Sequence, residues 1–505
     1  MPRFSFRSLL SLSACVALGL LPSARADVKL PSVFGSHMVL QRDQPDKVYG
    51  TADPGEEVSV SIADQTKTTK ADDKGRWSVT LDALKTSTKP LTMTVKGKNT
   101  VTFDDVLVGE VWICSGQSNM GFNLGSAYDA DIEALTAKLP NLRLISVPQV
   151  GTQEPQDDFK GHWEPCTPEA AKSFSAVGFF FGRQIYETLD NVPVGLIDDA
   201  WGGSAAEAWV RRDILEKDPK YKDLIASWEE REKQYEEAKS KGDEQKVKQL
   251  QGQMTGNHRP GNIYNGVLKP TIGYGIRGAI WYQGESNAGR AYQYRDLFPL
   301  MIQSWRDEWG IGDFPFYWVQ LADFMAEKGE PSDSAWAELR EAQTMTMDRL
   351  PNTGQAVIID VGEGRDIHPR NKRDVGKRLA RWALAKVYGV DVPYQSPTYK
   401  SMEAQGSKVI VTFDHVGPGG LYSFDTPEVQ GFTLAGEDKV FHNARAKVVG
   451  PDKVEVTSED VSHPVAVRYA WADNPVVNLY GKGSGLPATP FRSDDWKGVT
   501  AESTR

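Results

Sequence analysis

Ser118 lies in the stretch Cys114-Ser-Gly-Gln-Ser-Asn-Met120, where a serine can act as a nucleophile. The apolar run over residues 106–114 predicts a strand that ends just before this stretch. A serine on a tight turn after a strand projects its Oγ from the carboxyl edge of a sheet, where a general base can reach it. Gly116 permits such a turn. Met120 replaces the second glycine of the Gly-x-Ser-x-Gly elbow, which argues against the α/β-hydrolase fold.

A second polar loop, Asp360-Val-Gly-Glu-Gly-Arg-Asp366-Ile-His368, carries carboxylates and an imidazole. A strand is predicted over residues 356–360, and the glycine-rich loop after it presents Asp366 and His368. An imidazole can act as the base toward a serine when a carboxylate fixes its tautomer. The same residue types are also typical of a solvated surface loop, so the catalytic interpretation depends on His368 reaching Ser118.

Two further loops contain groups that could stabilise an oxyanion. Trp281-Tyr-Gln-Gly-Glu-Ser-Asn287 follows the apolar run at 278–282, and Asn287 could offer a side-chain N–H. Trp201-Gly-Gly-Ser204 follows a predicted strand at 192–197. Gly202 and Gly203 would let the backbone approach a ligand and direct an N–H toward it. Taken alone, each loop is equally compatible with a plain turn.

The elements between these loops alternate between strands and helices. Helical stretches are predicted over residues 174–189, 292–309 and 374–388, and a further strand over 316–321. This alternation predicts an α/β fold in which helices wrap a parallel sheet. Active sites in such sheets lie at the carboxyl ends of the strands. The four polar loops are therefore expected to converge on one edge.

Regions on both sides of this core have a different pattern. Residues 27–105 show short alternating runs separated by turn signals, which predicts a β-sandwich, and residues 392–505 predict a second β-rich module. The α/β region would then span 106–391. Within it, residues 213–253 are dense in Glu and Lys and predict a solvated helical hairpin or long helix.

The first 26 residues resemble a secretory signal. Arg3 and Arg7 precede an apolar stretch over 8–21, and Ala24-Arg25-Ala26 fits a cleavage site before Asp27. We therefore expect export to the periplasm or the extracellular space. A lipoprotein cleavage box ending at Cys15 is the alternative. No later segment is long and apolar enough to span a bilayer.

Composition narrows the classes of function. The 505 residues carry a net charge of −10, which argues against nucleic acid or an anionic membrane as the main partner. The seven histidines are scattered without a His/Cys cluster at ligand spacing, so no metal site is predicted. Export permits a disulfide between Cys114 and Cys166, and two separate buried thiols are the alternative.

Together, these motifs resemble the four blocks of SGNH hydrolases, in the variety found in sialate O-acetylesterases. The blocks are residues 115–120, 201–204, 281–287 and 366–372. The flanking stretches 38–42, 73–77, 468–473 and 485–492 are also similar to that family, so the resemblance covers nearly the whole mature chain. It implies a three-layer α/β/α core with a parallel sheet, flanked by all-β accessory domains.

The resemblance also implies roles for individual residues. Ser118 would be the nucleophile and His368 the general base, with an oxyanion hole made by the Ser118 N–H, an N–H of Gly202 or Gly203, and Asn287. The family's last block is Asp-x-x-His, whereas here one residue fewer separates the acid from the histidine. The carboxylate that orients His368 is therefore open between three candidates and a Ser–His dyad without one. The three candidates are Asp366, which we favour, Asp360 and Glu285, and Gln117 is a further possible supporting residue.

The implied activity is that of a carboxylic ester hydrolase. It would remove O-acetyl groups from sialic acid or another acetylated sugar through an acetyl-Ser118 intermediate, without a cofactor. Trp201, Trp281 and Tyr282 could stack on the sugar or could be core aromatics.

Three alternatives to this activity are open. An acetylxylan esterase or other polysaccharide acetylesterase would share the same machinery. A glycan-binding protein with an inactive core would not need Ser118, His368 and Asn287 together. A glycosidase using Asp360 and Glu363 leaves the serine loop unexplained.

Overall fold

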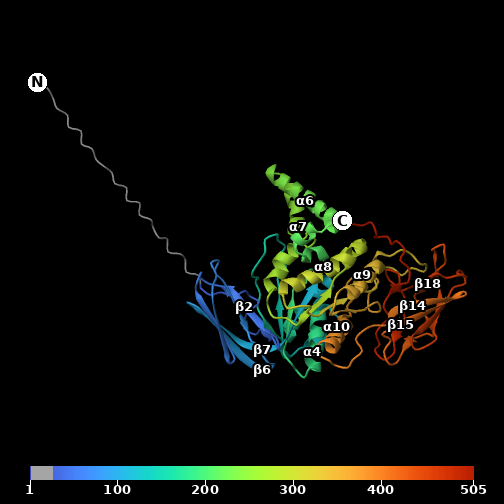
Figure 1. Cartoon of the computed structure of the whole chain (residues 1–505), viewed down its shortest axis with the longest axis horizontal. Helices are drawn as coiled ribbons and strands as arrows, with labels where there is room; N and C mark the ends of the chain where they lie inside the picture. Colours follow the sequence, from blue (N-terminus) through green and yellow to red (C-terminus); the bar gives the residue numbers. More distant parts are fainter. Residues whose placement is uncertain (2–26, 505) are drawn as a thin grey trace.

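The computed structural model describes Met1 and residues 27–504, and shows three parts in chain order (Figure 1). A β-rich part lies at the N-terminal end, an α/β part in the middle and a second β-rich part at the C-terminal end. This arrangement confirms the predicted fold class. The predicted signal segment falls within residues 2–26 and lies outside the described residues.

The central sheet has the strand order β13-β12-β11-β7-β10-β8-β9. Every neighbouring pair is parallel except β8 with β9 at one edge. Such a sheet is buried on both faces, which explains why its strands read as continuous apolar runs. The strands are β7 (Thr100–Gly116), β8 (Leu139–Ser146), β9 (Glu164–Cys166), β10 (Val194–Asp198), β11 (Gly278–Tyr282), β12 (Phe316–Val319) and β13 (Thr353–Ala356).

Helices cover both faces of this sheet (Figure 1). On one face α4 (Ala176–Thr188) packs against α10 (Lys372–Lys386), and on the other α8 (Ala291–Trp309) packs against α9 (Ala335–Arg349). A Cβ at Gly376 would lie 2.6 Å from the Cβ of Phe180, so this glycine lets α10 approach α4 closely. The result is the three-layer core that the sequence predicts.

Strand β7 joins the N-terminal part to the core. Its first half pairs with β6 (Ser87–Lys96) and β1 (Val39–Gln41), and its second half lies between β10 and β11. The predicted boundary at 105/106 falls inside this strand. The remaining strands of the N-terminal part are β2 (Asp46–Thr51), β3 (Glu57–Ile62), β4 (Gln65–Lys70) and β5 (Arg76–Leu81).

The C-terminal part has its own apolar core. Val357 and Ile359 belong to this second core, and β13 ends at Ala356. The prediction of a strand over 356–360 is therefore wrong in its position, because the chain leaves the sheet after Ala356 and buries Val357 and Ile359 in the C-terminal core. The larger of the two main sheets there contains β14 (Thr398–Gln405), β15 (Lys408–Asp414), β17 (Glu428–Val429), β20 (Arg445–Val448) and β21 (Lys453–Thr457), and the other contains β18 (Phe432–Ala435), β19 (Phe441–Asn443), β22 (Ala466–Tyr469) and β24 (Phe491–Arg492).

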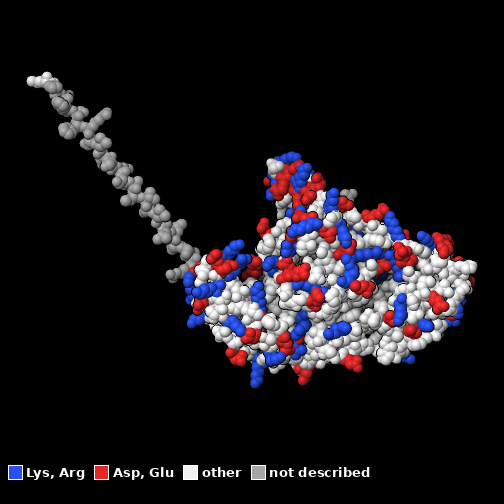
Figure 2. Space-filling view, in the orientation of Figure 1, with Lys and Arg blue, Asp and Glu red and all other residues white. Residues whose placement is uncertain are grey.

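The charged segment forms a helical hairpin of α6 (Lys222–Ser240) and α7 (Glu244–Met254), preceded by the short α5 (Arg212–Lys217). The hairpin projects from the body, and its tip carries both acidic and basic side chains (Figures 1 and 2). Among the described residues, none of the helices has the length and apolarity needed to cross a bilayer.

The two cysteines of the described chain are separate buried thiols, Cys114 in β7 and Cys166 in β9. Burial raises the pKa of the Cys166 thiol to about 12, and it raises that of Cys114 as well. The disulfide alternative does not occur.

Candidate active site

Ser118 is the first residue of the short helix α1 (Ser118–Gly121), directly after β7 ends at Gly116. Gly116 has a φ of +132°, and a Cβ there would lie 2.2 Å from the carbonyl oxygen of Tyr282. Only glycine fits this position, so the turn that aims Ser118 depends on it.

The structure brings His368 to Ser118, although 250 positions separate them in the chain. The Nε2 atom of His368 lies 2.8 Å from the Ser118 Oγ, which is hydrogen-bond distance for a base and a nucleophile. The imidazole also stacks on Phe122, with ring centroids 6.4 Å apart and an angle of 25° between the planes. The ring is therefore supported on one face while its Nε2 faces the serine.

Asp366 is the carboxylate beside His368. One of its oxygens accepts the backbone N–H of His368 at 2.9 Å and lies 3.6 Å from the imidazole Nδ1. The second distance is too long for a hydrogen bond but short enough for charge attraction. The Asp366 side chain is 55% exposed and that of His368 38% exposed, so water screens this attraction.

The other two candidate carboxylates bind other groups. Asp360 forms a two-pronged ion pair with Arg378, at 2.6 and 2.9 Å. Glu285 accepts a hydrogen bond from the Asn119 side chain at 2.7 Å. Of the three carboxylates, only Asp366 contacts His368.

The glycine loop 201–204 lies against the serine. A Cβ at Gly202 would lie 3.5 Å from the Ser118 Cβ, and the Trp201 N–H donates to the Gly116 carbonyl at 2.9 Å. Gly203 has a φ of +68°, a conformation that favours glycine. Within residues 27–504, the N–H groups of Ser118, Gly202 and Gly203 donate to no other protein atom. These three donors are therefore available to an oxyanion.

Asn287 is buried and held in one orientation. Its Oδ1 accepts from the Ala206 N–H at 2.9 Å and from the Gln283 amide at 2.7 Å, and its Nδ2 donates to Glu207 at 2.9 Å. One of its two amide N–H bonds is thus engaged. The second N–H is the one that could reach a ligand.

Gln117 connects two of the site loops. Its backbone N–H donates to the Tyr282 carbonyl at 2.8 Å, and its side-chain oxygen accepts from the Gly284 N–H at 3.2 Å. These contacts tie the serine turn to the loop that carries Asn287, which is a supporting role.

A buried polar cluster under the serine was not predicted from the sequence. The Asn119 amide donates to Glu285 and, at 2.9 Å, to the carbonyl of Ile367, and its oxygen accepts from the Lys372 Nζ at 2.5 Å. Burial lowers the pKa of Lys372 to about 7 and raises the pKa of Glu285. Asn119 and Lys372 both lie within the matched motifs, but nothing in the local pattern shows that they meet.

The proposed sugar-stacking aromatics are mostly in the core. Trp281 and Tyr282 are fully buried, and Trp281 packs against Trp209, Trp305 and Phe298. Of the two roles predicted for Trp281 and Tyr282, that of core aromatics therefore applies, and the prediction of stacking on a sugar is wrong. Trp201 is partly exposed beside the glycine loop and remains accessible.

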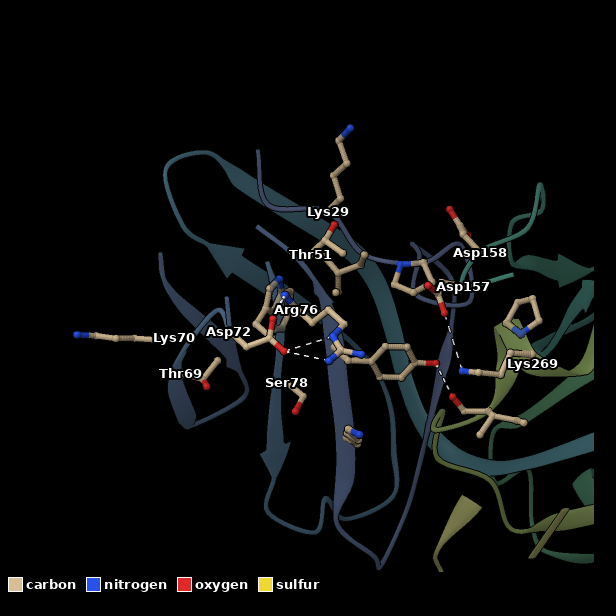
Figure 3. Close-up of a pocket in the computed structure, with 18 residues that line it drawn as sticks. Lys29, Thr51, Thr69, Lys70, Asp72, Arg76, Ser78, Asp157, Asp158 and Lys269 are labelled. Atoms are coloured by element: carbon tan, nitrogen blue, oxygen red, sulfur yellow. Dashed lines mark hydrogen bonds and ion pairs between the residues drawn. The ribbon is translucent and has the colours of Figure 1, made fainter. Parts of the chain in front are cut away.

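The site lies at the surface. It is separate from a cavity of about 650 Å³ between the N-terminal part and the α/β part (Figure 3). None of the residues lining that cavity belongs to the four site loops. Among residues 27–504, no cluster of three or more His, Cys, Asp or Glu side chains has the geometry to hold a metal ion.

Comparison with known proteins places the chain in a family. A family model described as carbohydrate esterase, sialic acid-specific acetylesterase, matches residues 108–242 and 256–385. Sialate O-acetylesterase from Mus musculus is 29% identical, over 93% of this chain and 95% of its own length. The Homo sapiens sialate O-acetylesterase is 28% identical, over 93% of each chain.

A solved structure is similar over nearly the whole chain. A carbohydrate acetylesterase from Xanthomonas citri aligns with a TM-score of 0.81 and 39% identity, covering 93% of this chain and all of that one. The catalytic region and both flanking β-rich parts are therefore shared with a carbohydrate acetylesterase. The chain belongs to the sialic acid-specific acetylesterase family of carbohydrate esterases.

Proposed function

We propose that the protein removes O-acetyl groups from sialic acid or a related acetylated sugar through an acetyl-Ser118 intermediate. The 2.8 Å contact between His368 Nε2 and Ser118 Oγ supports this proposal most directly. At this distance an imidazole nitrogen can accept the proton of the serine hydroxyl, and the N–H groups of Ser118, Gly202 and Gly203 have no protein acceptor in the described chain.

The first half of the reaction transfers the acetyl group to the enzyme. Ser118 Oγ attacks the acetyl carbonyl while His368 Nε2 takes its proton. The resulting oxyanion accepts hydrogen bonds from the free N–H groups of Ser118 and of Gly202 or Gly203, with Asn287 as a further donor. Asp366 stabilises the imidazolium by charge. As the intermediate collapses, the bond between the acyl carbon and the sugar oxygen breaks, and His368 gives its proton to that oxygen, so the sugar leaves as an alcohol.

The second half releases acetate. A water molecule takes the place of the sugar, and His368 removes its proton as it attacks the acetyl-serine carbonyl. The same N–H groups stabilise the second tetrahedral intermediate. Collapse of that intermediate breaks the Ser118 Oγ–acyl bond, and the proton returns from His368 to the serine.

A chromogenic acetate ester tests the nucleophile. We expect Ser118→Ala to lose hydrolysis and Ser173→Ala, at an exposed serine outside the site loops, to keep it. Wild-type rates in Ser118→Ala would refute the proposal. Acetate release from O-acetylated sialic acids, acetylated xylan and acetylated pectin then distinguishes a sialate esterase from a polysaccharide esterase.

We also propose that residues 1–26 direct export. The motif before Asp27 supports cleavage there, and Cys15 offers the lipoprotein alternative. Sequencing the amino terminus of the protein recovered from the periplasm or the medium tests this. A mature chain beginning at Asp27 supports simple cleavage, one beginning at Cys15 supports the lipid-anchored form, and an intact Met1 refutes export by this segment.

A further inference from the structure

Side chains just beyond the α6–α7 hairpin hold the glycine loop that faces Ser118. Asn257 Nδ2 donates to the Gly202 carbonyl at 2.5 Å, and the Asn257 carbonyl accepts from the Ala205 N–H at 3.1 Å. The Gly203 carbonyl accepts from His258 Nε2 at 2.8 Å and from the Ser286 hydroxyl at 2.9 Å. Residues 257 and 258, just after the hairpin, and Ser286, in the loop after β11, thus bind the two glycine carbonyls.

Holding the Gly202 carbonyl also fixes the Gly203 N–H, and holding the Gly203 carbonyl fixes the Ser204 N–H, which closes the turn by donating to the Trp201 carbonyl at 3.2 Å. In a trans peptide the C=O and the following N–H lie in one plane and point in opposite directions. A donor on the Gly202 carbonyl therefore sets the direction of the Gly203 N–H, which is one of the free donors at the site. A hydrogen bond to the carbonyl also polarises the peptide and strengthens its N–H as a donor.

The base of the hairpin anchors this segment in turn. Arg259 donates to Glu232 of α6 at 2.8 Å and to the Met254 carbonyl, at the end of α7, at 3.0 Å. Arg212 donates to the other oxygen of Glu232 at 3.0 Å. Glu232 thus joins α6 to the chain segments that enter and leave the hairpin, one of which carries Asn257 and His258. The base of the hairpin is therefore tied to the protein body by ion pairs.

We infer that Asn257 and His258 are positioning residues for the oxyanion hole, and that the α6–α7 hairpin is the scaffold that holds them. This inference rests on the proposed function, because it assumes that the Gly202–Gly203 loop binds the oxyanion. The sequence around 257–258 contains no catalytic motif, and the role follows only from where the two side chains donate.

Kinetics of single variants test the positioning role. We expect Asn257→Ala to lower kcat by about 10- to 100-fold with KM within about twofold, since losing an oxyanion donor outright typically costs about 10²- to 10³-fold. His258→Ala should lose less, because Ser286 still binds the Gly203 carbonyl. His258→Gln keeps an N–H donor and should recover most of that loss. Asn443→Ala is the matched control, because its side chain donates to a loop carbonyl, that of Gly329, outside the site.

A second readout separates positioning from general damage. A trifluoromethyl ketone forms a tetrahedral adduct with a nucleophilic serine, so its affinity should fall in Asn257→Ala by about the same factor as kcat/KM. Unchanged kcat and unchanged inhibitor affinity in Asn257→Ala would overturn the inference, even if Ser118→Ala is inactive. If Asn257→Ala does not fold, the comparison of His258→Ala with His258→Gln tests the inference instead. Equal kcat values for these two variants would then overturn the inference.

The cavity between the N-terminal part and the α/β part supports a second, independent inference. It is lined by β2, β4, β5 and residues 29–31 on one side and by residues 157–158 and 269–272 on the other. Figure 3 shows Asp72 beside Arg76 and Lys269 facing Asp157, with Lys29 and Lys70 extending outward at the rim. A volume of about 650 Å³ is in the range of sites that bind small ligands.

The cavity is basic on an acidic protein. Five cationic and three acidic side chains line it, whereas the whole chain carries a net charge of −10. In the described part of the chain, Lys29, Lys47 and Lys70 have no carboxylate partner. Lys47 lies over the Tyr49 ring at 5.9 Å, so an aromatic surface adjoins the charge. This combination fits a sugar that carries a carboxylate.

We propose that this cavity binds an acidic glycan and acts as a second, non-catalytic site. Affinity electrophoresis in gels containing polygalacturonate, at about 0.15 M salt to screen long-range attraction, tests it. We expect retardation of the wild type and of a control with Lys89, Lys96 and Lys138 changed to Ala, which removes equal charge elsewhere. A variant with Lys29, Lys47 and Lys70 changed to Ala should migrate freely and still hydrolyse the chromogenic ester. Free migration of the wild type, or equal retardation of the two triple variants, would overturn the proposal.

Discussion

Replacing Asp366 by Asn should reduce catalysis only modestly. Asn keeps an oxygen for the His368 backbone N–H, so the change removes the charge and little else. At the observed 3.6 Å, two unit charges attract by about 1 kcal/mol in water and about 5 kcal/mol at an effective dielectric of about 20. Because both side chains are more than a third exposed, the value near water applies. About 1 kcal/mol corresponds to a roughly 5- to 10-fold fall in kcat/KM.

The assay is hydrolysis of a chromogenic acetate ester by Asp366→Asn and by Asp129→Asn. Asp129 is a similarly exposed acid, 57% exposed, whose nearest cation is Arg373, so its loss controls for overall charge. Replacing the buried aspartate of a serine-protease triad by asparagine costs about 10⁴-fold in kcat, and an effect of that size here would refute the reasoning. It would mean that Asp366 binds the Nδ1–H closely when substrate is present. No effect at all would favour a Ser–His dyad.

Three further predictions concern buried ionisable groups. The pKa of Lys372 is lowered to about 7, so the unfolded chain binds more protons than the folded one between about pH 7 and 10.5. Wild type should therefore gain stability relative to Lys372→Met as pH rises through that window, and a constant difference in urea unfolding would contradict this. Burial raises the pKa of Asp46 to about 8, and its two oxygens lack a hydrogen-bond partner in the described chain, so wild type should lose stability relative to Asp46→Asn as pH rises from about 4 to about 8. The Cys114 and Cys166 thiols should react with a thiol reagent only in denaturant, and rapid reaction of the folded protein would show that they are not buried.

The core architecture could be predicted because its signals are local. Apolar runs of strand length, alternating with helical stretches, indicate a parallel sheet, and the rule for such sheets places the loops after β7, β10 and β11 at one edge. That rule explains why Ser118 and the glycine loop could be expected to meet. The strand predicted after Ala356 was wrong because residues buried in a second core show the same run of apolar residues as a buried strand.

The finer parts of the site depend on pairings between distant residues. The sequence favours Asp366 over Asp360 as the partner of His368 but does not exclude Asp360. The structure shows that Arg378, on α10, binds Asp360 instead. Trp281 and Tyr282 have the composition of a sugar platform, but their strand is central and covered on both faces. Asn257 acts through the backbone carbonyl of Gly202, and a contact between a side chain and a distant backbone group cannot be predicted from a sequence pattern.

Under the proposed mechanism, the carboxylate and the oxyanion hole contribute unequally to catalysis. The carboxylate is solvated and 3.6 Å from the imidazole, which limits its contribution to about 1 kcal/mol. The backbone donors lie on a loop fixed by Gly116, Ser286 and Asn257, and each such donor is typically worth about 3–4 kcal/mol. Losses should therefore rank with Ser118 first, the contacts that hold the Gly202–Gly203 loop next and Asp366 last. A larger loss from Asp366→Asn than from Asn257→Ala would reverse this division and would place the main stabilisation on the imidazolium.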